Sequence, residues 1–463
     1  MKNFITKIIE NSNEIVKTRF CPEPGGFLHI GHIKNFILNY KLSTIYKGKI
    51  NIRMDDSNPI KSKHIYSKRI YYEILSLGFN SKIKLSYSSD YFKRIYYISK
   101  AFIKKDLFYI DNMISKRVTS NIKINEKTIY KQREKKEKLY LIKKMRNGLF
   151  KEKEFVVRAN ITKHKGLIDP IVFRILKRLS KGVSIYPTYD LCNSISDRIE
   201  KITFSICTNE FINNKEIYNW LVSNYNKTFK KKLVPIQIEF SRMKIEGVTL
   251  GKRNIRNLIR MGIVKNWSDP RLYTVKGLIN RGISNKSIKE IALSTGYTRS
   301  NYVIKECFIR RILIRNLSKE VKRKTIVILK PVKVIVINLR DKKELFVESV
   351  RNIKCLYSFF LKKKLYNIFF LRKKPKCCVF LYFDIKIKMV CSNCITKINS
   401  NKAMLYTYLG NSIKKTICII KNNNNIGINR AKFRLKGLGY FYIYRNRSFI
   451  VCKEIVLFSK SIL

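Results

Sequence analysis

Short apolar-rich runs alternate with longer helical stretches over the first 87 residues of the chain. Residues 15–20 and 49–54 are typical of strands, and residues 29–46 and 62–77 are typical of helices. The Pro- and Gly-rich segment after residue 20 is typical of a loop. Strand, helix and strand in this order predict the start of a parallel α/β sheet.

The pattern of hydrophobic and polar positions changes again further along the chain. Residues 88–185 are less regular and very basic, with a helix predicted over 91–105, and they indicate an inserted subdomain. Alternation of strands and helices returns over 186–322, where 284–294 is predicted as a helix. From residue 323 to 463 short β-rich runs alternate with a period of two, which predicts antiparallel sheet closed into barrels.

Composition narrows the class of protein and its partners. Apolar residues make up 45% of the 463 residues, which permits a sizeable core and excludes disorder throughout. Lys and Arg number 98 against 31 Asp and Glu, a net charge of +67. Such a field attracts a polyanion such as nucleic acid. The excess is also explained by a compositional bias toward Lys, Ile, Asn and Tyr, as in proteins from AT-rich genomes.

Neither the termini nor the cysteines indicate secretion. The first residues are too short and too polar for a signal peptide, and no window approaches about 18 uninterrupted apolar residues, so we expect a cytoplasmic protein without a membrane span. The eleven Cys are then expected to be reduced thiols. Cys391 and Cys394 form a C-x-x-C pair, but a second pair at zinc spacing is missing, which favours thiols over a metal site.

The first chemically informative motif is Pro-Glu-Pro-Gly-Gly-Phe-Leu-His-Ile-Gly-His over residues 22–32. His29 and His32 are three positions apart, so they share one face of the predicted helix. They also lie in its first turn, where free N–H groups and the helix dipole favour an anion. Gly31 would let a ligand approach the helix closely. The segment predicts a phosphate cradle with two imidazoles, or else a plain helix N-terminus with two surface histidines.

These residues resemble a known family. His-Ile-Gly-His after Pro-Glu-Pro resembles the nucleotide-binding signature of class I aminoacyl-tRNA synthetases, and the string from Arg19 to Lys34 resembles that of glutaminyl-tRNA synthetases in particular. The resemblance is dense from residue 15 to about 290 and thin from 323 to 440. Further segments match in the same order along the chain: 53–59, 87–91, 186–190, 195–197, 207–211, 239–242, 267–271 and 438–441.

The resemblance implies a fold class of α/β followed by β. Residues 1–87 would form the first half of a Rossmann-like catalytic domain, and residues 88–185 an inserted acceptor-stem-binding subdomain. Residues 186–322 would form the second half, with a KMSKS-like loop and a helical connection. Residues 323–463 would form a shortened antiparallel β-barrel region that binds the anticodon.

The resemblance also implies a two-step reaction. L-Glutamine attacks the α-phosphate of ATP to give glutaminyl-adenylate and pyrophosphate, and the terminal ribose hydroxyl of tRNA(Gln) then takes the glutaminyl group. The first step gathers anions, so positioning and preorganised positive charge must carry most of the catalysis. The implied partners are ATP with Mg²⁺, L-glutamine and tRNA(Gln), and the implied state is a monomer.

Residue by residue, the match assigns His29, His32 and Lys252 to catalysis, with Lys252 as the phosphate-binding lysine of the mobile loop. Asp55 would bind the α-ammonium of glutamine, and Tyr189 would bind the substrate through its hydroxyl. No metal ligand is predicted. The residues assigned to ATP binding are Glu23, Pro24, Gly25, His29, Ile30, Gly31, His32, Ile33, Lys34, Asn35, Thr208, Arg242, Met243, Leu250, Gly251 and Lys252.

Two departures leave alternatives open. Gly251 replaces the Ser that is usual in the mobile loop, and Asn193 stands where the family usually has His. The alternatives are a glutamyl-tRNA synthetase of the two-barrel type and a non-catalytic tRNA-binding relative. Residues 53–59 and 186–189 favour the glutamine form, and the intact histidines and Lys252 favour an enzyme. A small-molecule nucleotidyltransferase would need neither the basic insertion nor the β-rich tail.

Overall fold

The computed structural model describes residues 15–79, 83–112, 130–152, 154–161, 169–176 and 185–321, and after them only the strands given below. The chain forms two compact units, which are described separately. The first unit comprises Met1–Glu246, Leu250–Arg256 and Lys289–Ile304. The second comprises Gly247–Thr249, Asn257–Ile288 and Lys305–Leu463.

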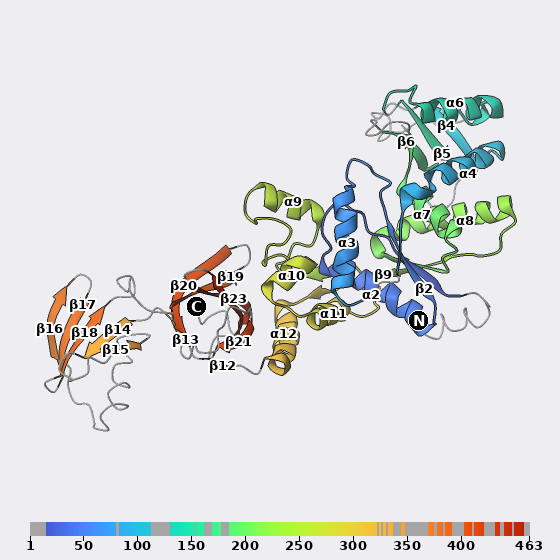
Figure 1. The fold of residues 1–463 in the computed structure, drawn as a ribbon. Coiled ribbons are helices and arrows are strands. Elements are labelled where there is room, and N and C mark those ends of the chain that lie inside the picture. The colour runs from blue at the N-terminus through green and yellow to red at the C-terminus, as the bar shows by residue number, and fades with distance from the viewer. Residues whose placement is uncertain are drawn as a thin grey trace. The chain divides into compact units, whose positions relative to one another are not determined.

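A five-stranded parallel sheet organises the first unit (Figure 1). Its strands are β1 (Lys17–Phe20), β2 (Lys49–Met54), β3 (Lys84–Tyr87), β8 (Phe204–Thr208) and β9 (Ile236–Phe240). The order is β3-β2-β1-β8-β9, and every neighbouring pair is parallel. The chain runs outward from β1 on one side and later returns on the other, which creates a topological switch point between β1 and β8. The predicted parallel sheet is confirmed.

The helices of this unit lie close to their predicted bounds. The predicted helix over 29–46 is α2 (Ile30–Ile45), and that over 62–77 is α3 (His64–Ser76). The differences of one or two residues are ordinary fraying at helix ends. Two further helices, α7 (Tyr189–Ile199) and α8 (Lys215–Phe229), follow the insertion and pack on each other.

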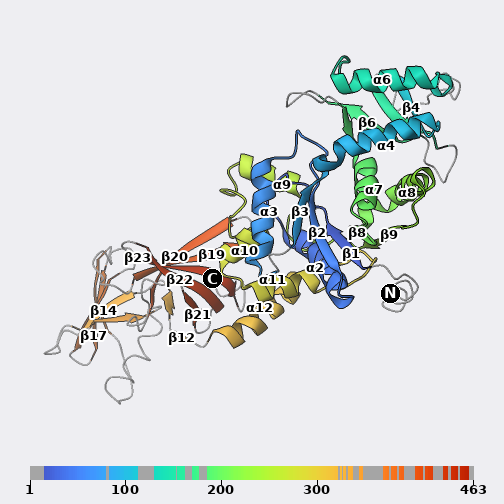
Figure 2. The ribbon, with the colours of Figure 1, turned by 45° about the vertical axis from the view of Figure 1, so that its right-hand side comes forward.

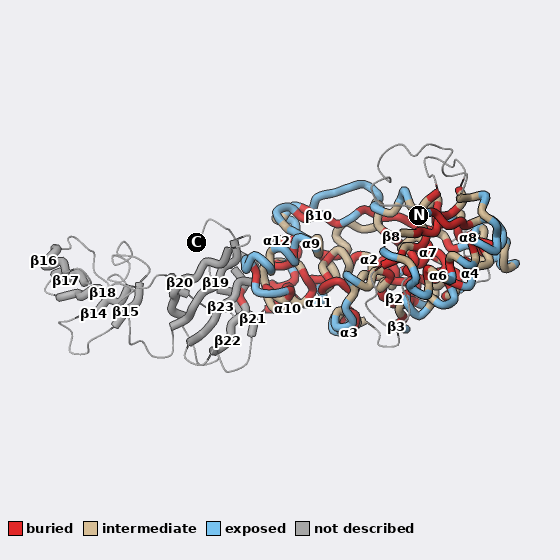
Figure 3. The backbone as a smooth tube through the Cα atoms, turned by 90° about the horizontal axis from the view of Figure 1, so that it is seen from above, coloured by how far each residue is buried: buried red, intermediate tan, exposed pale blue. Residues whose placement is uncertain are grey.

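Alternation along β1 determines what each face of the sheet meets. Thr18 and Phe20 face α2: the Thr18 hydroxyl donates to the Asn39 carbonyl at 3.1 Å, and the Phe20 ring packs edge-on against Phe36. Arg19 points to the opposite face, toward α7. Strand β8 is buried on both faces, as its red tube in Figure 3 shows. The sheet therefore has an apolar side under α2 and a polar side under α7.

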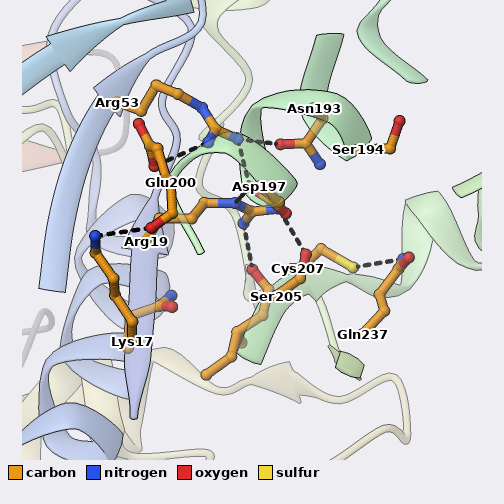
Figure 4. A network of polar contacts seen from close by, with 12 residues as sticks. Lys17, Arg19, Arg53, Asn193, Ser194, Asp197, Glu200, Ser205, Cys207 and Gln237 are labelled. Atoms are coloured by element: carbon orange, nitrogen blue, oxygen red, sulfur yellow. Dashed lines mark hydrogen bonds and ion pairs between the residues drawn. The ribbon is translucent and has the colours of Figure 1, made fainter. Parts of the chain in front are cut away.

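The polar side holds a buried ion network (Figure 4). Arg19 and Arg53 both bond the Asp197 carboxylate, at 3.2 Å and 2.6 Å. Arg53 also pairs with Glu200 at 3.0 Å. Two guanidinium charges face two carboxylates, so the desolvated charges are balanced. The network holds α7 against β1 and β2. It thereby fixes the position of the residues at the start of α7.

The predicted insertion contains a four-stranded antiparallel sheet of β4 (Phe108–Asn112), β5 (Phe155–Ala159), β6 (Ile171–Ile175) and β7 (Ile185–Pro187). Helices α4 (Phe92–Lys104) and α6 (Lys135–Asn147) lie beside β4 (Figure 2). One hydrophobic core runs through Ile95, Val157, Leu191 and Leu221. The insertion therefore shares its core with α7 and α8, and the domain limits at residues 88 and 185 stay predictions.

Four short elements lie at or near the limits of the units. In the first unit, β10 (Lys244–Ile245) pairs in parallel with β11 (Val303–Ile304). Helix α9 (Lys252–Arg260) begins in the first unit. Helix α11 (Asn285–Leu293) corresponds to the helix predicted over 284–294.

In its described residues, the second unit contains two complete helices and two β-sheets. The helices are α10 (Val275–Arg281) and α12 (Glu306–Glu320). One sheet has the order β12-β21-β22-β23-β19-β20-β13 and the other the order β15-β14-β18-β17-β16. The strands are β12 (Lys324–Thr325), β13 (Val327–Leu329), β14 (Val332–Val336), β15 (Glu344–Val347), β16 (Phe369–Lys374), β17 (Cys377–Tyr382), β18 (Ile385–Val390), β19 (Lys402–Leu409), β20 (Ser412–Ile420), β21 (Ala431–Leu435), β22 (Gly439–Asn446) and β23 (Phe449–Leu457).

The predicted antiparallel pairing holds for most neighbours in these sheets but is wrong for two. Strands β12 and β21 are parallel, and so are β19 and β23. Period-two alternation shows that a segment has two faces but does not encode the direction of its neighbour. Closure into barrels stays a prediction, and Cys391 and Cys394 lie outside the described residues. Within the described residues, no helix has the length and apolar character needed to span a bilayer.

Candidate functional site

Residues predicted for the site follow the carboxyl ends of four different strands. Glu23 follows β1, Asp55 follows β2, Thr208 ends β8, and Arg242 follows β9. Parallel strands end at the same edge of the sheet, so the fold brings these distant residues to one edge. That edge, beside the switch point, is where ligands bind in open α/β sheets.

The two histidines cap helix α2. His29 is the N-cap, and its Nδ1 accepts a hydrogen bond from Gly31 N at 3.1 Å. In return His29 N donates to Nδ1 of His32 at 3.2 Å. This is a capping box built from two imidazoles, whose ring centroids lie 3.6 Å apart. Because each Nδ1 accepts, these bonds assign the ring proton to Nε2, which is the donor left for a ligand.

Both imidazoles are neutral at physiological pH. Burial lowers the pKa of His29 to about 3, and the charges of Lys252 and Arg242 act in the same direction. Burial, with His29 and the same two cations, holds the pKa of His32 well below its ordinary value. The structure therefore brings Lys252 and Arg242 close to the pair. The pair therefore presents two fixed Nε2–H donors and no positive charge.

Gly31 makes room for a histidine ring. A Cβ built on Gly31 would lie 3.1 Å from the Cε1 and Nδ1 atoms of His29, and 3.8 Å from Cβ of Met243. The sequence suggested ligand approach as the reason for this glycine. In the structure, the close neighbours of Gly31 are these two side chains.

Lys252 begins α9, and its ammonium donates to the Glu23 carbonyl. Gly25 N donates to the same carbonyl at 2.9 Å, which closes a tight turn. Burial lowers the pKa of Lys252 to about 8; the Glu23 carboxylate opposes this shift and Arg256 adds to it. The predicted convergence of both histidines with this distant lysine is therefore present in the structure.

The Lys34 side chain is engaged in hydrogen bonds to other parts of the protein. Its buried ammonium donates to Ser241 O at 3.1 Å, to Ser241 Oγ at 3.4 Å and to Thr295 Oγ1 at 2.8 Å. Burial lowers its pKa to about 8. All three protons have protein acceptors, so Lys34 ties α2 to the segment after β9 that carries Arg242 and Met243. A direct role for Lys34 at the phosphates stays a prediction.

The other residues predicted for ATP binding differ in the contacts that they make. Asn35 accepts twice from the Asn39 amide, and the Gly251 carbonyl accepts from Ile255 N to begin α9. Arg242 pairs with Glu210. The remaining predicted residues have buried side chains and so would reach a nucleotide mainly through their backbone: Pro24, Ile30, Ile33 and Leu250.

The residues predicted to bind glutamine lie on the α7 side of the sheet. Asp55 accepts from Ser57 Oγ at 2.6 Å. The Tyr189 ring stacks on Phe211 at 4.8 Å, and its hydroxyl accepts from Asn193 Nδ2 at 3.5 Å. Burial raises the pKa of Tyr189 well above its ordinary value, and Asp55 contributes to the rise. The hydroxyl is therefore protonated and can donate to a ligand.

A pocket adjoins Tyr189, and sequence reasoning missed most of its wall. Asn193 belongs to this wall and is held by Arg53, whose Nη2 donates to its Oδ1 at 2.7 Å. The alternation along β8 and β9 was the available signal, because it places Ser205, Cys207 and Gln237 on the face toward α7. The lining residues are Tyr189, Asp190, Asn193, Ser205, Cys207, Phe211, Asn214, Tyr218 and Gln237.

The pocket wall combines aromatic rings with amides, hydroxyls, a thiol and one carboxylate. Neither Lys nor Arg lines it. Its one carboxylate, Asp190, accepts from Asn214 at 2.6 Å, and burial raises its pKa. Such a wall suits an uncharged amide better than a carboxylate. Within the described residues, no group of three or more His, Cys, Asp or Glu could hold a metal ion.

Comparisons with known proteins give matches over most of the chain. The catalytic-domain model of the class I tRNA synthetases (E and Q) matches residues 15–315. A glutamine–tRNA ligase of Buchnera aphidicola subsp. Schizaphis graminum (strain Sg) is 37% identical over 359 residues, covering 74% of this chain and 63% of the relative. One from Haemophilus ducreyi (strain 35000HP / ATCC 700724) is 34% identical over 355 residues, covering 73% and 63%. The chain thus matches less than two thirds of the length of either relative.

Among solved structures, a glutamate–tRNA synthetase from Elizabethkingia anophelis superposes with a TM-score of 0.47 at 15% identity, covering 66% of this chain and 71% of that chain. The family match runs from the first strand of the parallel sheet into α12, and it includes both histidines and Lys252. The chain therefore belongs to the class I tRNA synthetases (E and Q), whose catalytic domain it carries.

Proposed function

We propose that the chain ligates L-glutamine to tRNA(Gln), with ATP, through a glutaminyl-adenylate. The observation that carries the proposal is that His29, His32 and Lys252 converge at the edge of a sheet that also carries the pocket beside Tyr189. The names of the relatives, glutamine–tRNA ligases, support the same substrate. By analogy with the family, the protein acts as a monomer in the cytoplasm.

In the first step the chain positions anions and stabilises the departing pyrophosphate. The glutamine carboxylate attacks the α-phosphorus of ATP, and the bond to the β-phosphate oxygen breaks. The two Nε2–H groups donate to phosphate oxygens, and Lys252 neutralises charge that moves toward the leaving group. Mg²⁺ arrives with ATP as part of the substrate and supplies further charge neutralisation.

The amino acid is selected on the α7 side of the sheet. The Asp55 carboxylate attracts the α-ammonium, and the Tyr189 hydroxyl bonds the side chain. A glutamate carboxylate would enter a wall that neither Lys nor Arg lines and that already holds the Asp190 carboxyl group, and an unpaired buried charge costs several kcal/mol. An amide pairs with the Asn and Gln side chains of this wall instead, which favours glutamine over glutamate.

In the second step the terminal ribose hydroxyl of tRNA(Gln) attacks the glutaminyl carbonyl and AMP leaves. We assign residues 88–185 to the acceptor stem and residues 323–463 to the anticodon. Their basic residues contact phosphates and give affinity without reading the sequence.

ATP–pyrophosphate exchange tests the proposal. The full chain is assayed with glutamine or glutamate, each with and without tRNA, because the family analogy implies that activation requires tRNA. We expect exchange that depends on glutamine and on tRNA. Exchange driven by glutamate would point to the glutamyl enzyme. Absence of exchange with tRNA present would point to the non-catalytic relative.

A further inference from the structure

Arg256 lies one turn after Lys252 on α9 and, like it, belongs to the first unit. Residues four apart share a helix face. A Cβ built on Gly25 would lie 3.5 Å from Nη2 of Arg256, so the guanidinium reaches the Glu23–Gly25 turn. The Lys252 ammonium bonds the Glu23 carbonyl in the same turn. Two cations from α9 therefore converge on the Glu23–Gly25 turn.

The charges around Arg256 leave room for an anion. Its positive charge contributes to the lowered pKa of Lys252, which shows that the two cations repel each other. The Arg256 side chain is exposed, and among the described residues its guanidinium forms neither a hydrogen bond nor an ion pair. Glu23, itself part of the turn, would have its carboxyl carbon 3.8 Å from the same built Cβ, and with Glu73 and Asp55 it raises the pKa of Lys252. An anion bound between Arg256 and Lys252 would relieve their repulsion.

We propose that Arg256 is a second phosphate-binding cation of this site, which contacts the diphosphate end of ATP, or free pyrophosphate, together with Lys252. A guanidinium presents a fork of N–H donors that matches phosphate oxygens, whereas a lysine supplies a point charge. The catalytic role of this contact rests on the proposed function.

Binding of inorganic pyrophosphate to the full-length chain, measured by calorimetry without glutamine or tRNA, tests the inference. We expect Arg256→Gln to weaken the affinity about tenfold, because it removes one charge-assisted contact. Arg256→Lys, which keeps the charge, should recover most of the affinity. Arg260→Gln is the matched control: Arg260 is exposed in the last turn of the same helix, and its loss should change little.

Equal affinities of Arg256→Gln and Arg260→Gln, or a wild-type chain that binds no pyrophosphate, would overturn the inference. Thermal unfolding checks that the variants are folded, which the exposure of both arginines favours. The exchange assay then adds the KM for ATP, which should rise about tenfold in Arg256→Gln alone. If the wild-type chain shows no exchange, the proposed function fails, while the pyrophosphate affinities still decide the role of Arg256.

Discussion

At the scale of single residues, each histidine of the pair uses its two nitrogens differently. Nδ1 of His29 and of His32 accepts a backbone N–H at the start of α2, as the side chains of an ordinary capping box do. This leaves Nε2–H as the only donor of each ring. The same bonds fix ring orientation before any substrate arrives, so the donors are preorganised.

The first prediction separates capping from phosphate binding at His29. Asn is as good an N-cap as any residue, so His29→Asn should keep the thermal midpoint while removing the Nε2–H donor. We expect the turnover of ATP–pyrophosphate exchange to fall about 100-fold. His29→Ala should lose the cap as well and cost about 1 kcal/mol of unfolding free energy. Full activity of His29→Asn would show that the ring serves the helix alone.

The second prediction concerns pH. The pKa of Lys252 is lowered to about 8, so its ammonium is charged below that pH and loses its proton as the pH rises through it. The KM for ATP in the exchange assay should therefore rise between about pH 8 and 9.5. In Lys252→Arg the guanidinium stays charged, so this rise should disappear.

Lys34, whose pKa is also lowered to about 8, could titrate in the same range. An alkaline rise that persists in Lys252→Arg would therefore point to another group, such as Lys34, and contradict the role given to Lys252. Because the pKa of His29 is lowered to about 3, its ring is already neutral at the pH where a histidine ordinarily titrates. Titration of His29 should therefore not change the exchange activity in that lower pH range.

At the scale of elements, α3 clamps the loop that leads into α2. A carboxylate oxygen of Glu73 accepts from Leu28 N at 3.0 Å, and both residues are buried. Arg69, one turn earlier, pairs with Glu73 at 3.4 Å and lies over the Phe27 ring at 4.9 Å. Phe27 and Leu28, the two residues directly before the N-cap, therefore both contact α3.

The third prediction tests this clamp. Glu73→Ala leaves Leu28 N without its acceptor, which should cost about 1–3 kcal/mol of unfolding free energy and raise the KM for ATP several-fold. Glu73→Gln keeps an acceptor oxygen and should restore most of both quantities. Glu137→Ala is the control, since Glu137 in α6 forms an i,i+4 pair with Arg133, which precedes the helix, and its side chain is half-exposed. If Glu73→Gln raises the KM as much as Glu73→Ala does, the charge and not the hydrogen bond is what matters.

At the scale of the whole molecule, the net charge of +67 should govern the proposed encounter with tRNA. Each phosphate contact would release counterions, so we expect the tRNA affinity to fall steeply with salt. The fourth prediction is a loss of about 10³-fold between 50 and 200 mM salt, measured by filter binding of the full chain. A flat response would contradict the electrostatic interpretation.

His32→Ala and Lys252→Ala serve as internal controls for this experiment. Both residues are proposed to act in adenylate formation, so each substitution should lower exchange turnover far more than tRNA affinity and leave the salt dependence unchanged. Equal losses of turnover and of tRNA affinity would count against their assigned roles.

Local spacing and the order of motifs along the chain were enough to predict much of the structure of this protein. The strand over 49–54, the helices near 29–46 and 62–77, and the shared face of His29 and His32 follow from periodicity, which the neighbouring residues alone encode. Lys252 was identified by its place in an ordered series of motifs, and the structure brings it to the histidines.

The tertiary structure alone determined the partners of residues that are far apart in sequence. Lys34 was expected at the phosphates but bonds Thr295, 261 positions away. The approach of Arg256 to Gly25, the Glu73 clamp and the parallel pairing of β19 with β23 left no trace in periodicity. Periodicity specifies which face of an element is buried, whereas the identity and direction of its neighbour depend on how the whole chain packs.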